Sequence, residues 1–201
     1  MKIILVRHGQ TQWNQVERFR GQIDVPLNET GLAQAEAVAR RIAARWTPTA
    51  VYSSSLSRAM VTAQKIAQPF DLTVKPNAGL IDINFGQWQG LSPEEAQERW
   101  PEQVWNWLHA PQQVTIPGGE PFDQVQSRAL AAVNELVTKH PGDTIVLVSH
   151  TVINRLILLG ILNLGMEHFW TLRQDNCAIN VLEAETGRYV LVTMNDTCHL
   201  H

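Results

Sequence analysis

The sequence has little cysteine, no long apolar run and no targeting segment. Its two cysteines, Cys177 and Cys198, are too few for a disulfide framework or a cysteine-rich zinc site. The longest apolar stretch, residues 152–164, is interrupted by two asparagines and an arginine, so it is not a membrane span. At the N-terminus, Arg7 and His8 end the apolar start too early for a signal peptide. We therefore expect a cytoplasmic protein that makes no membrane contact.

An excess of basic residues is also missing. Sixteen lysines and arginines stand against 19 aspartates and glutamates, which gives a net charge of −3. A general nucleic-acid or membrane-surface binder would need the opposite balance, so neither partner is expected. The 201 residues, 44% of them hydrophobic, are enough for one domain that folds without a metal or a disulfide. What stands out in this composition is seven histidines.

Short β-branched runs alternate with longer helical patterns along the chain. This alternation predicts an α/β fold with a largely parallel sheet that is covered on both faces. A closing hairpin adds at least one antiparallel edge strand. The expected strands are residues 3–6, 50–53, 72–75, 144–148, 177–183 and 188–194, with a turn at 185–188 between the last two. The expected helices are residues 31–46, 56–67, 122–140 and a helix that begins at residue 151. Thr30 is a candidate cap for the first of these helices. A capping signal at Ser92 predicts another short helix. No linker or repeat divides the chain, so residues 1–201 are predicted to form one domain.

Residues 79–119 differ from the rest of the chain. The segment is rich in tryptophan and proline and reads as an insertion over one end of the sheet. Its tryptophans have two interpretations. They are satellite core packing, which is the commoner role of aromatic clusters, or they belong to a lid that shapes a substrate pocket.

Two of the expected buried strands end in a histidine. Arg7 and His8 follow the first strand, and His150 follows the strand at 144–148. Arg58 lies in the first turn of the helix after a third strand. In an open parallel sheet, ligands bind beyond the carboxyl ends of the strands, so these side chains should meet on one rim. Two arginines and two histidines in an acidic chain indicate a site for a compact anion, and phosphate fits best.

This set of residues predicts phosphoryl transfer through histidine. Neutral His8 could attack phosphorus through Nε2, and Arg7 and Arg58 would lower its pKa and bind the phosphoryl oxygens. His150 could donate to the same oxygens, and the helix N-terminus at Thr151 would add backbone donors. The acid that protonates the leaving oxygen should lie within residues 80–86, where Asp82 is the candidate.

A metal site is the rival explanation for paired histidines. His-x-x-x-His spacing is absent, and no carboxylate cluster stands beside His8. We expect no metal and no cofactor.

Taken together, these motifs resemble the histidine phosphatase, or phosphoglycerate mutase-like, superfamily. The resemblance runs over nearly the whole chain and is carried by residues 5–11 with Asn14, 21–22, 27–31 with 34–35, 52–59 with 62–63, 117–120 and 148–150. It implies a three-layer α/β/α sandwich around a mostly parallel, roughly six-stranded sheet, and a chemistry that needs no metal. It also implies that His8 is the phosphorylated nucleophile, that Arg7, Arg58 and His150 complete the phosphate pocket, and that Asn14, Gly21 and Gln22 line it.

Two positions depart from the family pattern. The branch with this segment usually has Glu where Asp82 stands, and an Asp general acid would need a pKa about 3 units above ~3.9 to act at pH 7. The C-terminal residues 195–200 look like those of metal-independent phosphoserine phosphatases, in which the tail closes on the substrate, so His199 is a candidate substrate ligand. That group has His where Phe85 stands, which makes Phe85 a candidate for the substrate side.

The resemblance leaves several activities open. A metal-independent phosphoserine phosphatase acting on a small phosphorylated metabolite is the first hypothesis. An alpha-ribazole or broad small-molecule phosphatase, a phosphoglycerate mutase and a non-catalytic phosphate sensor are the alternatives. The tryptophans also leave a homodimer open.

Overall fold

The computed structural model describes residues 1–185 and 187–201. The strands are β1 (Lys2–Arg7), β2 (Ala50–Ser53), β3 (Val74–Pro76), β4 (Thr144–Ser149), β5 (Ile179–Glu185) and β6 (Arg188–Asp196). The α-helices are α1 (Gln12–Gln15), α2 (Glu29–Arg45), α3 (Ser57–Ala67), α4 (Pro93–Arg99), α5 (Pro101–His109), α6 (Phe122–Lys139) and α7 (Thr151–Ile161). Each expected strand and helix is present, with ends that shift by a few residues. Among the described residues, none of the helices has the length and apolar character to cross a membrane.

The six strands form one mixed sheet in the order β3-β2-β4-β1-β5-β6. β1, β2, β3 and β4 pair in parallel, whereas β5 is antiparallel to both β1 and β6. The edge strand β6 is thus the antiparallel edge strand that the sequence predicted. Part of the expected turn at 185–188, Thr186, lies outside the described residues.

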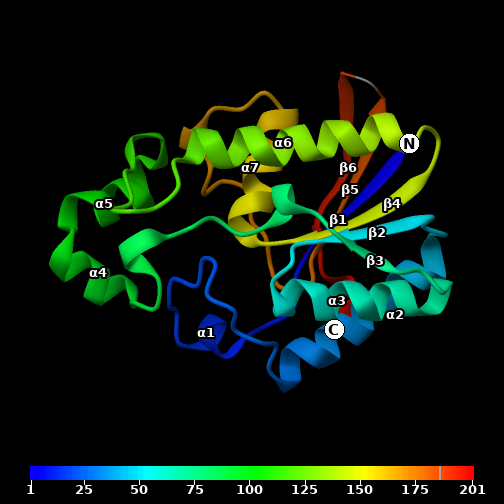
Figure 1. Ribbon diagram of the computed structural model, residues 1–201, viewed down its shortest axis with the longest axis horizontal. Coiled ribbons are helices and arrows are strands. Elements are labelled where there is room, and N and C mark those ends of the chain that lie inside the picture. Colours follow the sequence, from blue (N-terminus) through cyan, green and yellow to red (C-terminus); the bar gives the residue numbers. More distant parts are fainter. Residues whose placement is uncertain (186) are drawn as a thin grey trace.

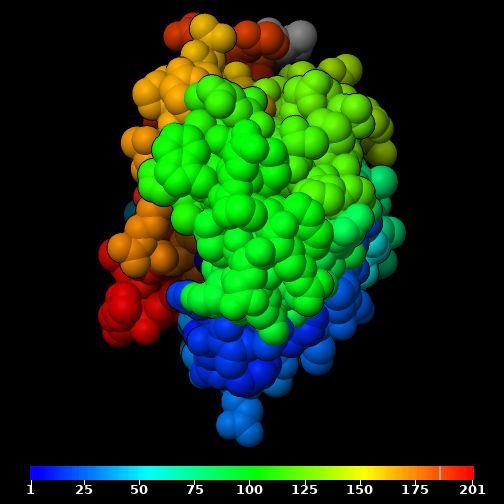
Figure 2. Space-filling view, turned by 90° about the vertical axis from the view of Figure 1, so that its left-hand side faces the viewer, coloured from blue at the N-terminus to red at the C-terminus, as the bar shows by residue number. Residues whose placement is uncertain are grey.

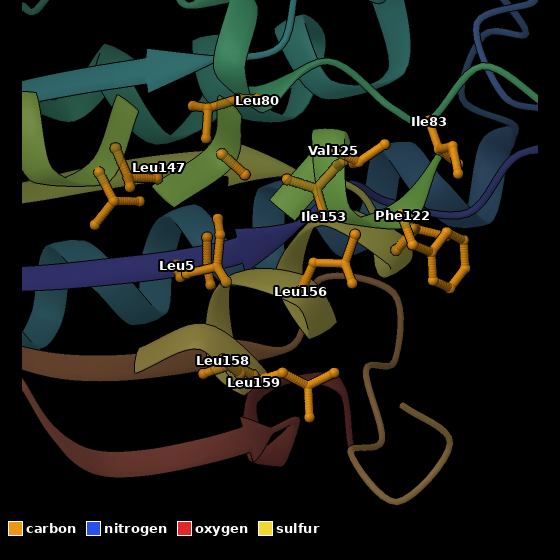
Figure 3. Close-up of a cluster of buried hydrophobic side chains, with 14 of the residues drawn as sticks. Leu5, Leu80, Ile83, Phe122, Val125, Leu147, Ile153, Leu156, Leu158 and Leu159 are labelled. Atoms are coloured by element: carbon orange, nitrogen blue, oxygen red, sulfur yellow. The ribbon is translucent and has the colours of Figure 1, made fainter. Parts of the chain in front are cut away.

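Helices cover both faces of the sheet, which gives three layers (Figure 1). Successive residues of a strand point to opposite faces, so the apolar run at the start of the chain supplies both cores. Ile3 and Leu5 belong to the hydrophobic cluster on the α6 and α7 side, together with Leu147 and Leu156. Figure 3 shows Leu5, Leu147 and Leu156 in this cluster. Ile4 and Val6 pack on the opposite side, against α2 and α3. The prediction that this strand is buried on both faces is confirmed.

Local capping explains where two helices begin. The capping box predicted before α4 is present, because the Ser92 hydroxyl accepts from the Glu95 N–H at 3.2 Å and the Glu95 carboxylate accepts from the Ser92 N–H at 2.7 Å. The expectation that Thr30 caps the first long helix is wrong. Asn28 is the cap, and its side chain accepts from the Gly31 N–H at 2.8 Å, so α2 begins two residues earlier than expected.

The carboxyl ends of β1, β2 and β4 point toward the end of the molecule where α1, α4 and α5 lie (Figure 1). Figure 2 looks onto this end, and residues 79–119, coloured green, cover much of it above the blue N-terminal segment. The tryptophans of this segment fit both interpretations. Trp88 is fully buried core, whereas Trp107 is buried and also lines a pocket.

Candidate active site

The two strand-end histidines meet because β1 and β4 are neighbours in register. Arg7 pairs with Ser149 across the sheet, so the residues that follow, His8 and His150, lie side by side. Their ring centroids are 5.0 Å apart, and both side chains are buried. The prediction that the two histidines share one rim of the sheet is confirmed.

His8 is held in one tautomer by its own loop. Its Nδ1 lies 2.6 Å from the carbonyl oxygen of Gly9. A carbonyl oxygen only accepts, so Nδ1 carries the proton and Nε2 of the neutral ring keeps its lone pair. The loop fits here because Gly9 touches the start of α2, where a Cβ on Gly9 would lie 2.5 Å from the Gly31 carbonyl oxygen.

The surroundings of His8 keep it neutral. Burial lowers its pKa well below 6.5, and the neighbouring guanidinium groups of Arg58 and Arg7 lower it further. The pKa of His150 is lowered for the same reasons, burial first and then Arg58. Both arginines have the predicted effect on His8, but burial is the larger cause. Neutral Nε2 is the form that can attack phosphorus.

Backbone carbonyls fix the guanidinium groups of Arg7 and Arg58, and each group keeps an N–H donor that no described residue accepts from. Arg7 Nη1 donates to the Gln174 carbonyl at 2.7 Å. Arg58 Nη2 donates to the Gly21 carbonyl at 2.6 Å, and its Nη1 to the Ile23 carbonyl at 2.9 Å. The Nε atoms of both arginines are buried and have no partner among the described residues.

Unpartnered polar atoms gather at this rim. Of the buried atoms without a described partner, Nε of Arg7, Nε of Arg58 and both ring nitrogens of His150, one of which carries the proton, belong to the predicted phosphate ligands. Nε of Arg20 and Oγ1 of Thr151 belong to residues that line the adjoining pocket. Buried donors normally have a partner, since leaving one unpaired costs about 1–3 kcal/mol. These atoms therefore fit an oxyanion that accepts several hydrogen bonds at once, as a phosphoryl group does.

Asp82 lies beside these donors, although its side chain is one methylene shorter than that of the Glu usual at this position. Its Oδ2 lies 3.3 Å from Arg58 Nη2 and 3.5 Å from His150 Nδ1. Burial raises its pKa, while the charges of Arg58 and Arg20 and a hydrogen bond from the Ile83 N–H lower it, and the net shift is upward. An upward shift is what a general acid needs. The structure thus places Asp82 beside both the guanidinium of Arg58 and the ring of His150, and its role as the acid stays a prediction.

The backbone around Asp82 is fixed from two sides. Gln22 Nε2 donates to the Asp82 carbonyl at 3.0 Å. Arg128 donates to the carbonyls of Gly79, Ile81 and Asp82 and forms an ion pair with Glu120 at 2.7 Å. Sequence reasoning had noted Glu120 only as part of a motif and had no role for Arg128. We infer that the pair sets the position of the acid.

A pocket of about 530 Å³ opens from His8 toward residues 79–119. Of the side-chain positions predicted for the substrate, Asn14, Gly21, Phe85 and Thr151 line it. Gln22 does not line it, because its amide is engaged with the Asp82 carbonyl.

The expectation that His199 is a substrate ligand is not supported by its position. The residue is not part of the pocket lining, and its Nε2 lies 3.1 Å from the carbonyl oxygen of Cys177. It sits in a short 3₁₀ turn, Cys198–Leu200, that contacts α2. The tail is therefore docked against the body of the domain and does not lie over the pocket.

Among the pocket-lining residues that were not predicted are Arg20, Arg155 and Trp170, whereas Trp107 belongs to the segment that was interpreted as a lid. Trp170 donates from Nε1 to the Trp107 carbonyl at 2.6 Å, which ties residues 79–119 to the segment after α7. Arg155 lies over the rings of Phe169 and Trp170 at 5.0 and 4.6 Å. For Arg155, the sequence held one signal: an arginine inside a mostly apolar helix, α7.

No group of three or more histidine, cysteine, aspartate or glutamate side chains within the described residues is arranged to hold a metal ion.

The buried neutral histidines should make stability depend on pH. An unfolded histidine takes up a proton near pH 6.5, but His8 and His150 stay neutral well below that in the folded state, so the free energy of unfolding falls as the pH drops from 7 to 5.5. The slope is at most about 1.4 kcal/mol per pH unit for each histidine. Urea unfolding at several pH values measures it.

Comparison of variants isolates one histidine, because the other titrating groups then cancel. His8→Gln cannot titrate at this position and should therefore show a shallower pH dependence of the free energy of unfolding than wild type. Equal slopes for wild type and His8→Gln would contradict a neutral buried His8.

Comparisons with known proteins agree with this geometry. The profile of the histidine phosphatase superfamily (branch 1) matches residues 3–197. Phosphoserine phosphatase 1 of Hydrogenobacter thermophilus is 36% identical over 200 residues, which cover 100% of this chain and 94% of that protein. The structure of Bacillus stearothermophilus YhfR matches with a TM-score of 0.95 at 28% identity, covering 100% of this chain and 99% of that one.

A third relative was solved with a bound ligand. The structure of a mutant of Entamoeba histolytica phosphoserine phosphatase in complex with phosphoserine matches with a TM-score of 0.90 at 30% identity, covering 100% of this chain and 99% of that one. The profile match spans almost the entire sequence. The chain belongs to branch 1 of the histidine phosphatase superfamily, and it is a phosphatase.

Proposed function

We propose that this phosphatase is a metal-independent phosphoserine phosphatase that works through a phosphohistidine. The observation that carries the reaction is the ring of unpartnered donors around neutral His8, with Asp82 beside them. The substrate rests on the likeness to phosphoserine phosphatases of Hydrogenobacter thermophilus and Entamoeba histolytica. Hydrolysis of phosphoserine would place the chain at the step that releases serine.

In the first step, His8 Nε2 attacks phosphorus in line with the ester oxygen. The N–P bond forms and the P–O ester bond breaks, while Arg7, Arg58 and His150 hold the three phosphoryl oxygens. Protonated Asp82 gives its proton to the leaving oxygen, so that serine departs as a neutral alcohol. This transfer leaves Asp82 as a carboxylate, which is the form that the second step needs.

In the second step, a water molecule replaces serine. The Asp82 carboxylate takes a proton from this water, the new P–O bond forms, and the N–P bond breaks to restore neutral His8. Inorganic phosphate then leaves the donors that held it. Each step uses groups of this chain, so the reaction needs no metal.

Residues 79–119 act in this proposal as a lid. Pro93, Val104, Trp107 and Leu108 line the pocket from this segment, and the Trp170 hydrogen bond holds it closed over His8. A cytoplasmic location and a homodimer stay predictions.

The aromatic pocket wall supports a second candidate function. Phe19, Phe85, Trp107 and Trp170 give the pocket an apolar side, and its volume lies in the range of pockets for larger ligands. This arrangement favours a broad small-molecule phosphatase that also takes esters with an aromatic leaving group.

A phosphate-release screen separates these functions. We expect phosphoserine to give a higher kcat/KM than alpha-ribazole phosphate, phosphoglycerates and sugar phosphates, and a chelator to leave the rate unchanged. Faster release from alpha-ribazole phosphate would favour the second candidate. Isomerisation of phosphoglycerate without release would indicate a mutase, and binding of phosphate without turnover would indicate a sensor. The His8→Ala variant provides the blank.

A further inference from the structure

The pocket has more charged groups than the phosphoryl group uses. Besides Arg7, three charged residues from the loop after α1 line it, Glu17, Arg18 and Arg20. Neither Glu17 nor Arg20 forms an ion pair within the described part of the chain, whereas Arg18, which lies between them in the sequence, pairs with Glu95 at 3.0 Å. Among the described residues, this loop thus presents one unpaired anion and one unpaired cation to a ligand.

Arg20 is half-buried, and its charge acts on the pKa of the general acid Asp82. Its Nη1 donates to the Trp13 carbonyl at 3.0 Å, and its Nε is buried and has no described partner. Burial lowers its pKa to about 10, and the Asp82 carboxylate opposes that shift, so the guanidinium is charged at neutral pH. Asp82 protonates the leaving oxygen, and a cation near Asp82 therefore faces the leaving group.

Glu17 lies at the mouth of the same pocket. Its side chain is exposed, and its backbone is in the left-handed region, with a φ of 48°. Such a conformation is uncommon for a residue other than glycine, asparagine or aspartate, and it tends to be kept where it positions a functional group. Only Arg18 and Phe19 separate Glu17 from Arg20, so the two opposite charges reach one ligand from one loop.

Arg155 is a weaker candidate for the leaving group. Its guanidinium is stacked on Phe169 and Trp170, and its Nε donates to the Leu172 carbonyl at 2.7 Å. The acid that raises its pKa is Asp175, not Asp82. Arg155 therefore belongs to the pocket wall away from the general acid.

We propose that Arg20 binds the carboxylate, and Glu17 the ammonium group, of an amino-acid leaving group. In phosphoserine both groups are on the carbon next to the ester CH₂, so the two charges of the ligand lie together just beyond the scissile bond. This inference rests on the proposed phosphoserine activity, and it assigns the recognition of serine to residues 17–20.

Four phosphomonoesters test the two contacts separately. Phosphoserine carries both charges, 3-phosphoglycerate replaces the ammonium by a hydroxyl, phosphoethanolamine lacks the carboxylate, and glycerol 3-phosphate lacks both. We compare kcat/KM for wild type, Arg20→Gln and Glu17→Gln. The matched controls are Arg99→Gln and Glu98→Gln, which replace exposed residues of the same charges on α4.

Arg20→Gln should lower kcat/KM about 10- to 100-fold more for phosphoserine and 3-phosphoglycerate than for phosphoethanolamine and glycerol 3-phosphate, since a charge-assisted pair is lost only with the first two. Glu17→Gln should lower kcat/KM about fivefold more for phosphoserine and phosphoethanolamine than for the two substrates without an ammonium group. The effect is small because the Glu17 side chain is exposed. Both controls should keep the wild-type order of substrates.

The failure of this inference differs from the failure of the proposed function. If wild type hydrolyses phosphoserine no faster than glycerol 3-phosphate, the proposed function is wrong. If wild type prefers phosphoserine but Arg20→Gln lowers kcat/KM by the same factor for all four substrates, Arg20 binds the phosphoryl group and the inference is overturned. An unchanged preference in Glu17→Gln would overturn the ammonium contact, and circular dichroism confirms that each variant is folded.

Discussion

Replacing His8 by alanine is expected to reduce phosphate release by roughly 10⁴-fold or more, because the reaction loses its nucleophile. The hydrogen bond from Nδ1 to the Gly9 carbonyl leaves Nε2 of neutral His8 with its lone pair, and Arg7 and Arg58 have buried Nε atoms without a described partner. Wild type mixed rapidly with a ³²P-labelled substrate should carry a label that is lost in acid and stable in alkali, as a phosphohistidine is. The His8→Ala variant should carry none.

His8 is only 1% exposed, so its replacement must be separated from misfolding. Thermal unfolding monitored by circular dichroism should show a folded His8→Ala variant, and binding of inorganic phosphate should persist because the arginines remain. His168→Ala, on an exposed turn, is the matched control and should retain full activity. If the turnover of His8→Ala stayed within tenfold of the wild-type value, the mechanism would be wrong.

Replacing Asp82 by asparagine is expected to lower kcat for phosphoserine by about 10²- to 10⁴-fold, the usual contribution of a general acid. Phosphate binding should weaken little or become stronger, because the carboxylate 3.3 Å from Arg58 Nη2 competes with phosphate for that guanidinium. The loss should be much smaller with p-nitrophenyl phosphate, whose leaving group departs without a proton. Steady-state kinetics and inhibition by inorganic phosphate give both quantities.

Asp123→Asn, an exposed position on α6, is the control for this variant and should behave as wild type. Equal losses in turnover and in phosphate affinity would remove Asp82 from the mechanism. Equal losses with phosphoserine and p-nitrophenyl phosphate would also do so, because a proton donor matters most for the poorer leaving group.

The centre of the site could be predicted because it depends on sheet topology. An apolar run ending in a histidine marks a strand end, and parallel neighbours place such ends together. His8, Arg7 and His150 follow from that rule, and Arg58 follows from its place at the start of a helix. The buried run at the start of β1 and the alternation of strands and helices gave the fold class in the same way.

The outer part of the site could not be predicted, because it depends on contacts between distant loops. Arg20 enters the pocket because the loop that carries it pairs with the lid, where the Phe19 N–H donates to the Leu91 carbonyl at 2.9 Å and the Gly90 N–H donates to the Phe19 carbonyl at 2.8 Å. Hydrophobic periodicity along the sequence does not predict such a pairing between loops. The docking of His199 against the Cys177 carbonyl is of the same kind.

The central position of β1 has a consequence for how the chain acquires its activity. Ile3 pairs with Ile145 on one side and with Leu182 on the other, so β1 has no neighbour in the sheet until residues 144–149 have been synthesised. Sheets closed by such distant pairings fold slowly. The carboxyl ends of β1 and β4, which are followed by His8 and His150, come together only when this pairing forms. Recovery of phosphatase activity therefore reports the last stage of refolding.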